Sequence, residues 1–186
     1  MIQQLKFPLD PPSQEIIRNI VRELLVTSTP GMELLEAAAF TTTFALTVDG
    51  DTDVAYKLII FCNTGGTAPT IDLRFNADAG ANYDQVQYVV GRPAGADAVL
   101  HNNSNGVTSI PLFYLSRAHF VIEAIISAKS GFVRLVSAKT SSHDSYNAAE
   151  NILTEGIWTN TADNITAINI ILSQTVTGNY ALYKLS

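Results

Sequence analysis

Hydrophobic and polar residues alternate with a period of two over most of the chain after residue 40. Such alternation places successive side chains on opposite faces of a β-strand. We predict strands where it holds, and where a short apolar run is bounded by turn residues. These segments are Phe40–Val48, Val54–Cys62, Thr70–Phe75, Gln85–Val90, Ala98–His101, Val107–Phe113, Ala118–Ser127, Gly131–Thr140, Gly156–Thr159, Ile165–Ser173 and Asn179–Leu185.

Turn-forming residues separate the predicted strands, for example at Asp49-Gly50-Asp51 and Asn102–Gly106. Many short strands with such punctuation, and no helical segments between them, are typical of an antiparallel sandwich or barrel. The clearest hairpin joins Ala118–Ser127 to Phe132–Lys139 across a Lys-Ser-Gly turn. We therefore predict one all-β domain over residues 37–186, folded as an antiparallel β-sandwich.

Residues 1–36 have a different pattern and form a predicted N-terminal arm. Three prolines between positions 8 and 12 indicate an extended start, and Ser13 is suited to cap a helix. Apolar residues then recur at helical spacing until Pro30-Gly31 ends the pattern. The stripe consists of Ile16, Ile17, Ile20, Val21, Leu24 and Leu25. We predict one amphipathic helix at about residues 13–26.

A helix of about three turns is marginal alone, so this stripe needs a cover. Folding back onto the chain's own sandwich is one interpretation. The other is docking on a neighbouring subunit, which makes the arm an anchoring or oligomerisation element.

The composition favours a protein that packs against other subunits. Hydrophobic residues make up 47% of the chain and charged residues only 15%, against a typical charged share of about 25%. The net charge is −6 and basic residues do not cluster, which argues against nucleic acid and anionic membrane surfaces as partners. No apolar run of about 18 residues or secretory signal is recognisable, so we expect synthesis in a cytoplasm without membrane insertion.

Motifs that carry chemistry are not found. A calcium loop starting at Asp49 would need Gly and Glu where Val54 and Ile60 stand, so a turn is favoured over a weak ion site. The histidines His101, His119 and His143 lack metal-ligand spacing. The single cysteine, Cys62, lies in an apolar run and is predicted to act as a small hydrophobic residue. We predict no catalytic residues, no metal and no cofactor.

Aromatic residues divide into two groups. Phe120 and Trp158 belong to alternating apolar patterns and are predicted to fill the core. Tyr83 and Tyr146 lie in loops rich in Asn, Asp and Ser, where an exposed ring could stack on a sugar or a partner. Simple coverage of a loop edge is the favoured interpretation of both tyrosines.

Three blocks give the chain a family resemblance. The segment Leu73–Tyr83 reads L-R-F-N-x-D-x-G-x-N-Y, Trp158–Ile170 reads W-x-x-x-x-x-x-I-x-x-I-x-I, and Gly178–Tyr183 reads G-x-x-x-L-Y. In this order they resemble segments of tail, fibre and head-decoration proteins of tailed bacteriophages. The chain departs from the pattern after its last block, where Lys184 stands in place of a common Gly.

The resemblance implies a jelly-roll-like sandwich that serves as a virion building block, and it transfers no catalytic residue. We therefore expect a structural component of a phage virion, a head-decoration, head-fibre or tail-attached protein, made in the host cytoplasm and contacting other virion proteins. A homo-oligomer is expected, and resemblance favours a trimer. The alternative is a carbohydrate- or receptor-binding module for host attachment through Tyr83 or Tyr146. A glycan hydrolase, the third alternative, would need paired carboxylates in a cleft.

Overall fold

The computed structural model describes residues 31–50, 52–63, 69–91, 98–113, 119–143 and 149–185. The predicted helix over residues 13–26 lies outside them together with its apolar stripe, and so does Tyr146. For residues 98, 99, 143 and 149 only the backbone is described.

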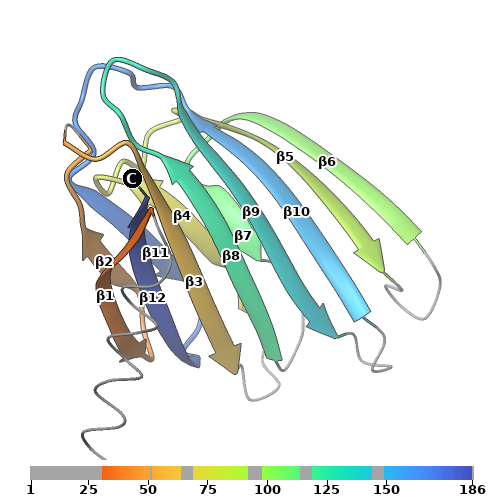
Figure 1. The fold of residues 1–186 in the computed structure, drawn as a ribbon. Coiled ribbons are helices and arrows are strands. Elements are labelled where there is room, and N and C mark those ends of the chain that lie inside the picture. The colour runs from red at the N-terminus through yellow and green to blue at the C-terminus, as the bar shows by residue number, and fades with distance from the viewer. Residues whose placement is uncertain are drawn as a thin grey trace, which may run out of the picture.

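Every regular element in these residues is a β-strand, so the predicted all-β class is confirmed. The strands are β1 (Met32–Phe40), β2 (Phe44–Thr47), β3 (Ala55–Asn63), β4 (Ile71–Phe75), β5 (Tyr83–Gly91), β6 (Ala98–Val107), β7 (Ile110–Phe113), β8 (His119–Ser127), β9 (Arg134–His143), β10 (Ala149–Trp158), β11 (Ala167–Leu172) and β12 (Thr177–Leu185). Figure 1 shows them as two layers.

The two sheets differ in size. The large sheet has eight strands in the order β1-β12-β3-β8-β9-β10-β5-β6, and the small sheet has four in the order β2-β11-β4-β7. All neighbours are antiparallel. The first strands pair with the last, β1 with β12 and β2 with β11, while β3 pairs with β8 and β4 with β7. The strands β9, β10, β5 and β6 complete the large sheet.

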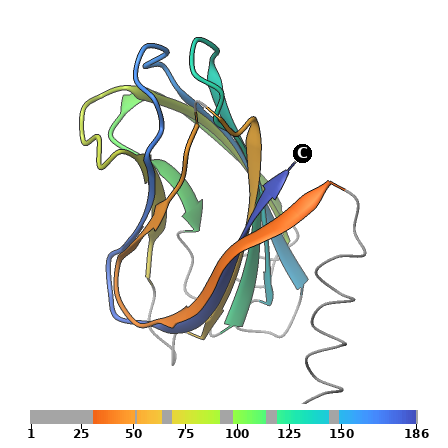
Figure 2. The same ribbon diagram turned by 60° about the vertical axis from the view of Figure 1, so that its left-hand side comes forward.

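The core lies between the sheets, which face each other in Figure 2. On β3, Tyr56, Leu58 and Ile60 point inward and are fully buried, and residues of β4 and β11 approach from the small sheet. Full burial of one such side chain contributes about 1.5–3 kcal/mol. Phe120 and Trp158 are 3% and 1% exposed, which confirms their predicted core positions.

The strongest local prediction is also confirmed. Strands β8 and β9 pair as an antiparallel hairpin, with Phe120 opposite Ser142 and Ile126 opposite Val136. Gly131, in the connecting turn, has a φ of +79°, a conformation that side chains other than glycine rarely adopt.

The predicted turn at Asn102–Gly106 is wrong, because β6 runs on to Val107. Leu100 and Asn102 stand opposite the buried Val89 and Gln87 of β5, yet both are exposed. The small sheet therefore does not cover β6. A segment with neither face buried needs no hydrophobic alternation, so the pattern could not reveal β6 beyond the predicted segment Ala98–His101.

Two further strands extend beyond the predicted segments. Strand β10 starts at Ala149, well before the predicted Gly156. The pattern missed this start because two inward positions of the strand hold buried polar residues, Glu150 and Thr154. Strand β1 starts at Met32, inside the range 1–36 predicted as arm, and pairs with β12. The second half of β1 contains three consecutive exposed alanines, so apolar and polar residues do not alternate there.

Candidate functional site

The segment that carries the resemblance forms the tight loop between β4 and β5. The Asp78 carboxylate accepts hydrogen bonds from the Gly80 amide at 2.8 Å, Asn82 Nδ2 at 2.9 Å and Trp158 Nε1 at 2.8 Å. The bond from Trp158 is the main cause of a lowered pKa at Asp78, and it outweighs the opposing effect of burial. The loop is thus fixed by its own polar side chains together with the Trp158 indole.

Asn76 ties this loop to the second block of the resemblance. Its Oδ1 accepts from the amides of Thr166 at 2.8 Å and Ala167 at 3.1 Å, and its Nδ2 donates to the Asn164 carbonyl at 2.7 Å. We name the loop residues Asn76, Asp78, Asn82 and Tyr83, together with Trp158, the Asp78 junction. It joins the two sheets, because Tyr83 of β5 bonds to Phe75 of β4 and Trp158 of β10 bonds to Asp78.

The alternative of an exposed ring at Tyr83, considered beside the favoured loop-edge position, is wrong. Tyr83 is fully buried, and its hydroxyl accepts a hydrogen bond from the Phe75 amide at 3.0 Å and donates to the Asp78 carbonyl at 3.2 Å. Burial raises the pKa of this phenol to about 12. The ring opens the inward series of β5, in which Gln85 and Gln87 are also buried. Because these inward residues are polar, the sequence does not show the alternation of apolar and polar residues that would have predicted a buried Tyr83.

A buried arginine, Arg134, also has a structural role. Arg134 is fully buried, lies 5.7 Å from the Trp158 ring centroid, and donates to the carbonyls of Phe132, Asn160 and Asp163. It therefore fixes the connection between β10 and β11. The sequence did not predict this buried role, because an Arg between a turn and a strand carries no pattern that indicates it.

Asp49 and Gly50 are part of a turn, as predicted for this segment. The Asp53 amide donates to the Asp49 carbonyl at 2.8 Å, and Thr52 Oγ1 donates to the Asp49 carboxylate at 2.8 Å. Asp53 accepts from the Tyr56 hydroxyl at 2.7 Å and forms an ion pair with Lys184 at 2.6 Å. Burial raises the pKa of Asp53, but the bonds from Lys184 and Tyr56 outweigh it and leave the pKa lowered. Within the described residues, no group of three His, Cys, Asp or Glu could hold a metal ion.

Cys62 is buried, as predicted, and burial raises its thiol pKa to about 12. The thiol is therefore protonated near neutral pH and is a poor nucleophile. Among the histidines, His101 stacks on Tyr88 with centroids 5.0 Å apart. His119 is exposed at the start of β8.

The outer face of the large sheet is the surface on which exposed apolar residues gather. These residues point away from the core at paired positions of neighbouring strands, as Leu153 of β10 does opposite Tyr88 of β5. The large apolar side chains exposed on this face are Phe61, Tyr88, Val90, Ile125, Leu135 and Leu153. Charges of both signs lie between them, among them Lys57 and Glu123, whose charged atoms are 3.9 Å apart.

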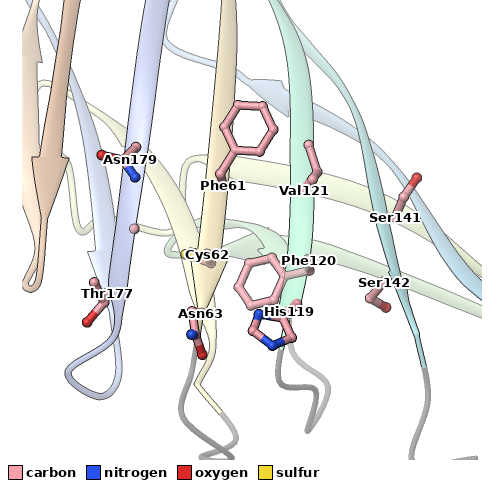
Figure 3. Close-up of a pocket in the computed structure, with 11 residues that line it drawn as sticks. Phe61, Cys62, Asn63, His119, Phe120, Val121, Ser141, Ser142, Thr177 and Asn179 are labelled. Carbon is pink, nitrogen blue, oxygen red and sulfur yellow. The ribbon is translucent and has the colours of Figure 1, made fainter. Parts of the chain in front are cut away.

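One end of this face contains an open hollow of about 620 Å³. Figure 3 shows its side chains coming from the neighbouring strands β12, β3, β8 and β9. Phe61, 53% exposed, and His119 contribute rings, and Asn63, Thr177 and Asn179 contribute amides and a hydroxyl. None of the described residues that line it is Asp, Glu, Lys or Arg, so the hollow is suited to an uncharged ligand.

A smaller hollow of about 370 Å³ lies on the same face over β5, β6, β9 and β10. It includes the carboxylates of Asp84 and Glu155, and each accepts a hydrogen bond within the sheet, from the Gly106 amide and the Ser137 hydroxyl respectively. Both carboxylates therefore have structural partners.

The described part of the chain contains no helix with the length and hydrophobicity that crossing a bilayer requires. No protein-family model matches this sequence, and no curated protein matches it.

Proposed function

We propose that this chain is a structural component of a phage virion, a head-decoration, head-fibre or tail-attached protein with a jelly-roll-like sandwich. The pairing of β1 with β12, β2 with β11, β3 with β8 and β4 with β7 supports this topology, because a long hairpin rolled into two sheets gives that pattern. Jelly rolls are common in viral capsid proteins and in lectins. In this interpretation β5, β6, β9 and β10 are insertions that widen one sheet.

The outer face of the large sheet is the observation that carries the proposal. Among the described residues it exposes six large apolar side chains on a protein of low charge, and such surfaces mark sites of association with other subunits. Neighbouring virion proteins and further copies of the chain are the proposed partners. The Asp78 junction also supports a structural role, because the residues behind the resemblance serve the fold.

The arm is the proposed anchor to the particle. Its stripe over Ile16–Leu25 supplies apolar residues at helical spacing, and the described chain enters the large sheet at Met32. An experiment on the arm must therefore leave Met32 and the residues after it intact, because removing all of residues 1–36 would also remove half of β1.

The test uses the full chain with Ile20→Asp and Leu24→Asp together, which put two charges on the apolar stripe. We expect a folded protein that no longer enters particles when produced together with the other virion proteins. Asn19→Asp, on the polar side of the stripe, is the matched control and should enter normally. Normal incorporation of the double variant would show that the stripe is not the anchor.

The hollow supports a second candidate function, the binding of an uncharged carbohydrate. A saccharide presents C–H faces that pack on aromatic rings and hydroxyls that pair with amides and hydroxyls. Phe61 and Asn179 stand opposite each other on β3 and β12 and offer these two kinds of contact. The candidate glycan site therefore lies at this hollow and not at Tyr83.

A glycan array probed with the native protein tests this candidate. We expect binding of neutral glycans that is lost in Phe61→Ala and in Asn179→Ala. Val133→Ala, at a position that is 50% exposed and outside the hollow, is the control and should bind normally. An array without any binder, or equal binding by all variants, would exclude the hollow as the glycan site.

A further inference from the structure

Strand β6 forms one edge of the large sheet and lies at the far right in Figure 1. It runs over ten residues with the sequence AVLHNNSNGV, which contains no charged residue and no proline. It pairs with β5 on one side only, and within the described residues no strand pairs with its other side. A backbone edge of this kind presents amide and carbonyl groups to which another strand can add.

The other three sheet edges carry features that block such addition. Strand β1 has Glu33 and Glu36 and a break in register between Leu34 and Glu36. Strands β2 and β7 have four residues each, and β7 contains Pro111. Charge, bulges, shortness and proline are the devices by which proteins protect edges from pairing. On β6, the only features of this kind are a break in register and the positive φ of Gly106, both near the end of the strand. Residues 98–104 therefore have no feature that blocks the pairing of another strand.

The side chains of β6 add a second argument. Leu100 is 49% exposed although its partner Val89 on β5 is 1% exposed, because the sheet overhangs the smaller layer at this edge. On the other face, His101 is exposed and stacks on Tyr88. An added strand would cover Leu100 on one face and extend the row of Tyr88 and His101 on the other.

We propose that β6 pairs with β6 of a second copy of this chain, antiparallel and about a two-fold axis, so that two large sheets become continuous. A second copy fits because an uncharged strand meets its own copy without repulsion, whereas the chain as a whole carries a net charge of −6. A two-fold axis also makes the contact self-complementary, as in most closed homodimers. The proposal rests on the structural role proposed above and names the partner at this edge. It gives a dimer in place of the trimer expected from resemblance.

The first test measures the mass of the full chain in solution by light scattering. The intact protein should have twice the monomer mass of 20.1 kDa, and Leu100→Lys combined with Asn102→Lys should reduce it to the monomer. Leu35→Lys is the matched control, because Leu35 is 40% exposed on the opposite edge, and it should stay dimeric. A monomeric or trimeric intact chain, a dimeric double variant, or a Leu35 variant that also dissociates would each overturn the two-fold pairing.

The second test locates the axis by single-cysteine scanning over residues 100–104. Antiparallel partners lie about 4.5–5.5 Å apart at Cα, within reach of a disulfide, only where a residue meets its own copy. The native Cys62 is buried and gives no background. We expect an oxidised dimer at one or two positions, and cross-linking at none or at all of them would contradict the pairing.

The two proposals fail separately. If the β6 variants keep the native mass while the arm variants lose incorporation, the β6 pairing is wrong and the structural role stands. If the β6 variants become monomeric while no arm variant affects incorporation, the pairing stands and the anchoring role is wrong.

Discussion

The Asp78 junction and the β6 edge both contain several asparagines, yet they have opposite structures. At the junction, side-chain amides and carboxylates pair with backbone groups, as Asn76 does with the Thr166 amide just before β11. At the edge, Asn102 and Asn103 are exposed, and no strand of the described residues pairs with one side of the backbone. The recognisable sequence pattern thus marks the region that specifies the fold, whereas the surface open to a partner has no such pattern.

The largest expected effect is at the junction. Trp158→Ala removes a buried ring that contacts Phe75, Tyr83 and Arg134 and takes away a donor to Asp78. We expect a loss of about 3–5 kcal/mol in the free energy of unfolding, measured by urea denaturation. Phe132→Ala, at a ring that is 66% exposed, is the control and should change little. Equal losses of unfolding free energy in the two variants would contradict the distinction between the buried junction and the exposed surface.

A smaller loss is expected for Asp78→Asn, about 1–3 kcal/mol at neutral pH, because three donors lose a charged acceptor. The pKa of Asp78 is lowered in the folded state, so its stabilisation is present above its ordinary value of 3.8 and is lost as the pH falls below it. Unfolding measured between pH 7 and pH 2 should therefore show a flatter acid dependence in the variant. An unchanged acid dependence would place the pH-sensitive stability elsewhere, for example at Asp53.

Tyr83→Phe tests the burial of the hydroxyl at the junction. The variant keeps the ring but loses the bonds to Phe75 and Asp78, and a loss of about 0.5–1.5 kcal/mol is expected. Thermal unfolding measures it, and Tyr88→Phe, at a ring that is 42% exposed, is the matched control. A neutral Tyr83→Phe would favour the exposed ring that the sequence left open as an alternative.

The smallest effect on stability is expected at the edge. Leu100→Ser should change the free energy of unfolding of the monomer by less than about 0.5 kcal/mol, because the side chain is half exposed. Denaturation at a protein concentration low enough to dissociate any dimer measures it. A loss of several kcal/mol would mean that Leu100 packs within its own subunit, and β6 would then not be an open edge.

The sequence was sufficient for the features that depend on burial with a simple period. The all-β class, the β8–β9 hairpin and the core positions of Phe120 and Trp158 follow from alternation and turn residues. The part of β6 after His101 was not predicted because neither face is covered there. The start of β10 was not predicted because Glu150 is polar and buried. The hollow could not be predicted, since Phe61 and Asn179 become neighbours only through the pairing of β3 with β12.

The pairing of β1 with β12 has a mechanical consequence. A pull on the sandwich from its N-terminal side enters at Met32, whose partner is Leu185 near the other end of the chain, and the ladder runs on to Phe40 opposite Gly178. Hydrogen bonds of an antiparallel pair lie across the strands. A force along β1 therefore shears all these bonds together, whereas a force across it peels them one after another. The direction in which the chain is tethered sets how much tension the sandwich withstands.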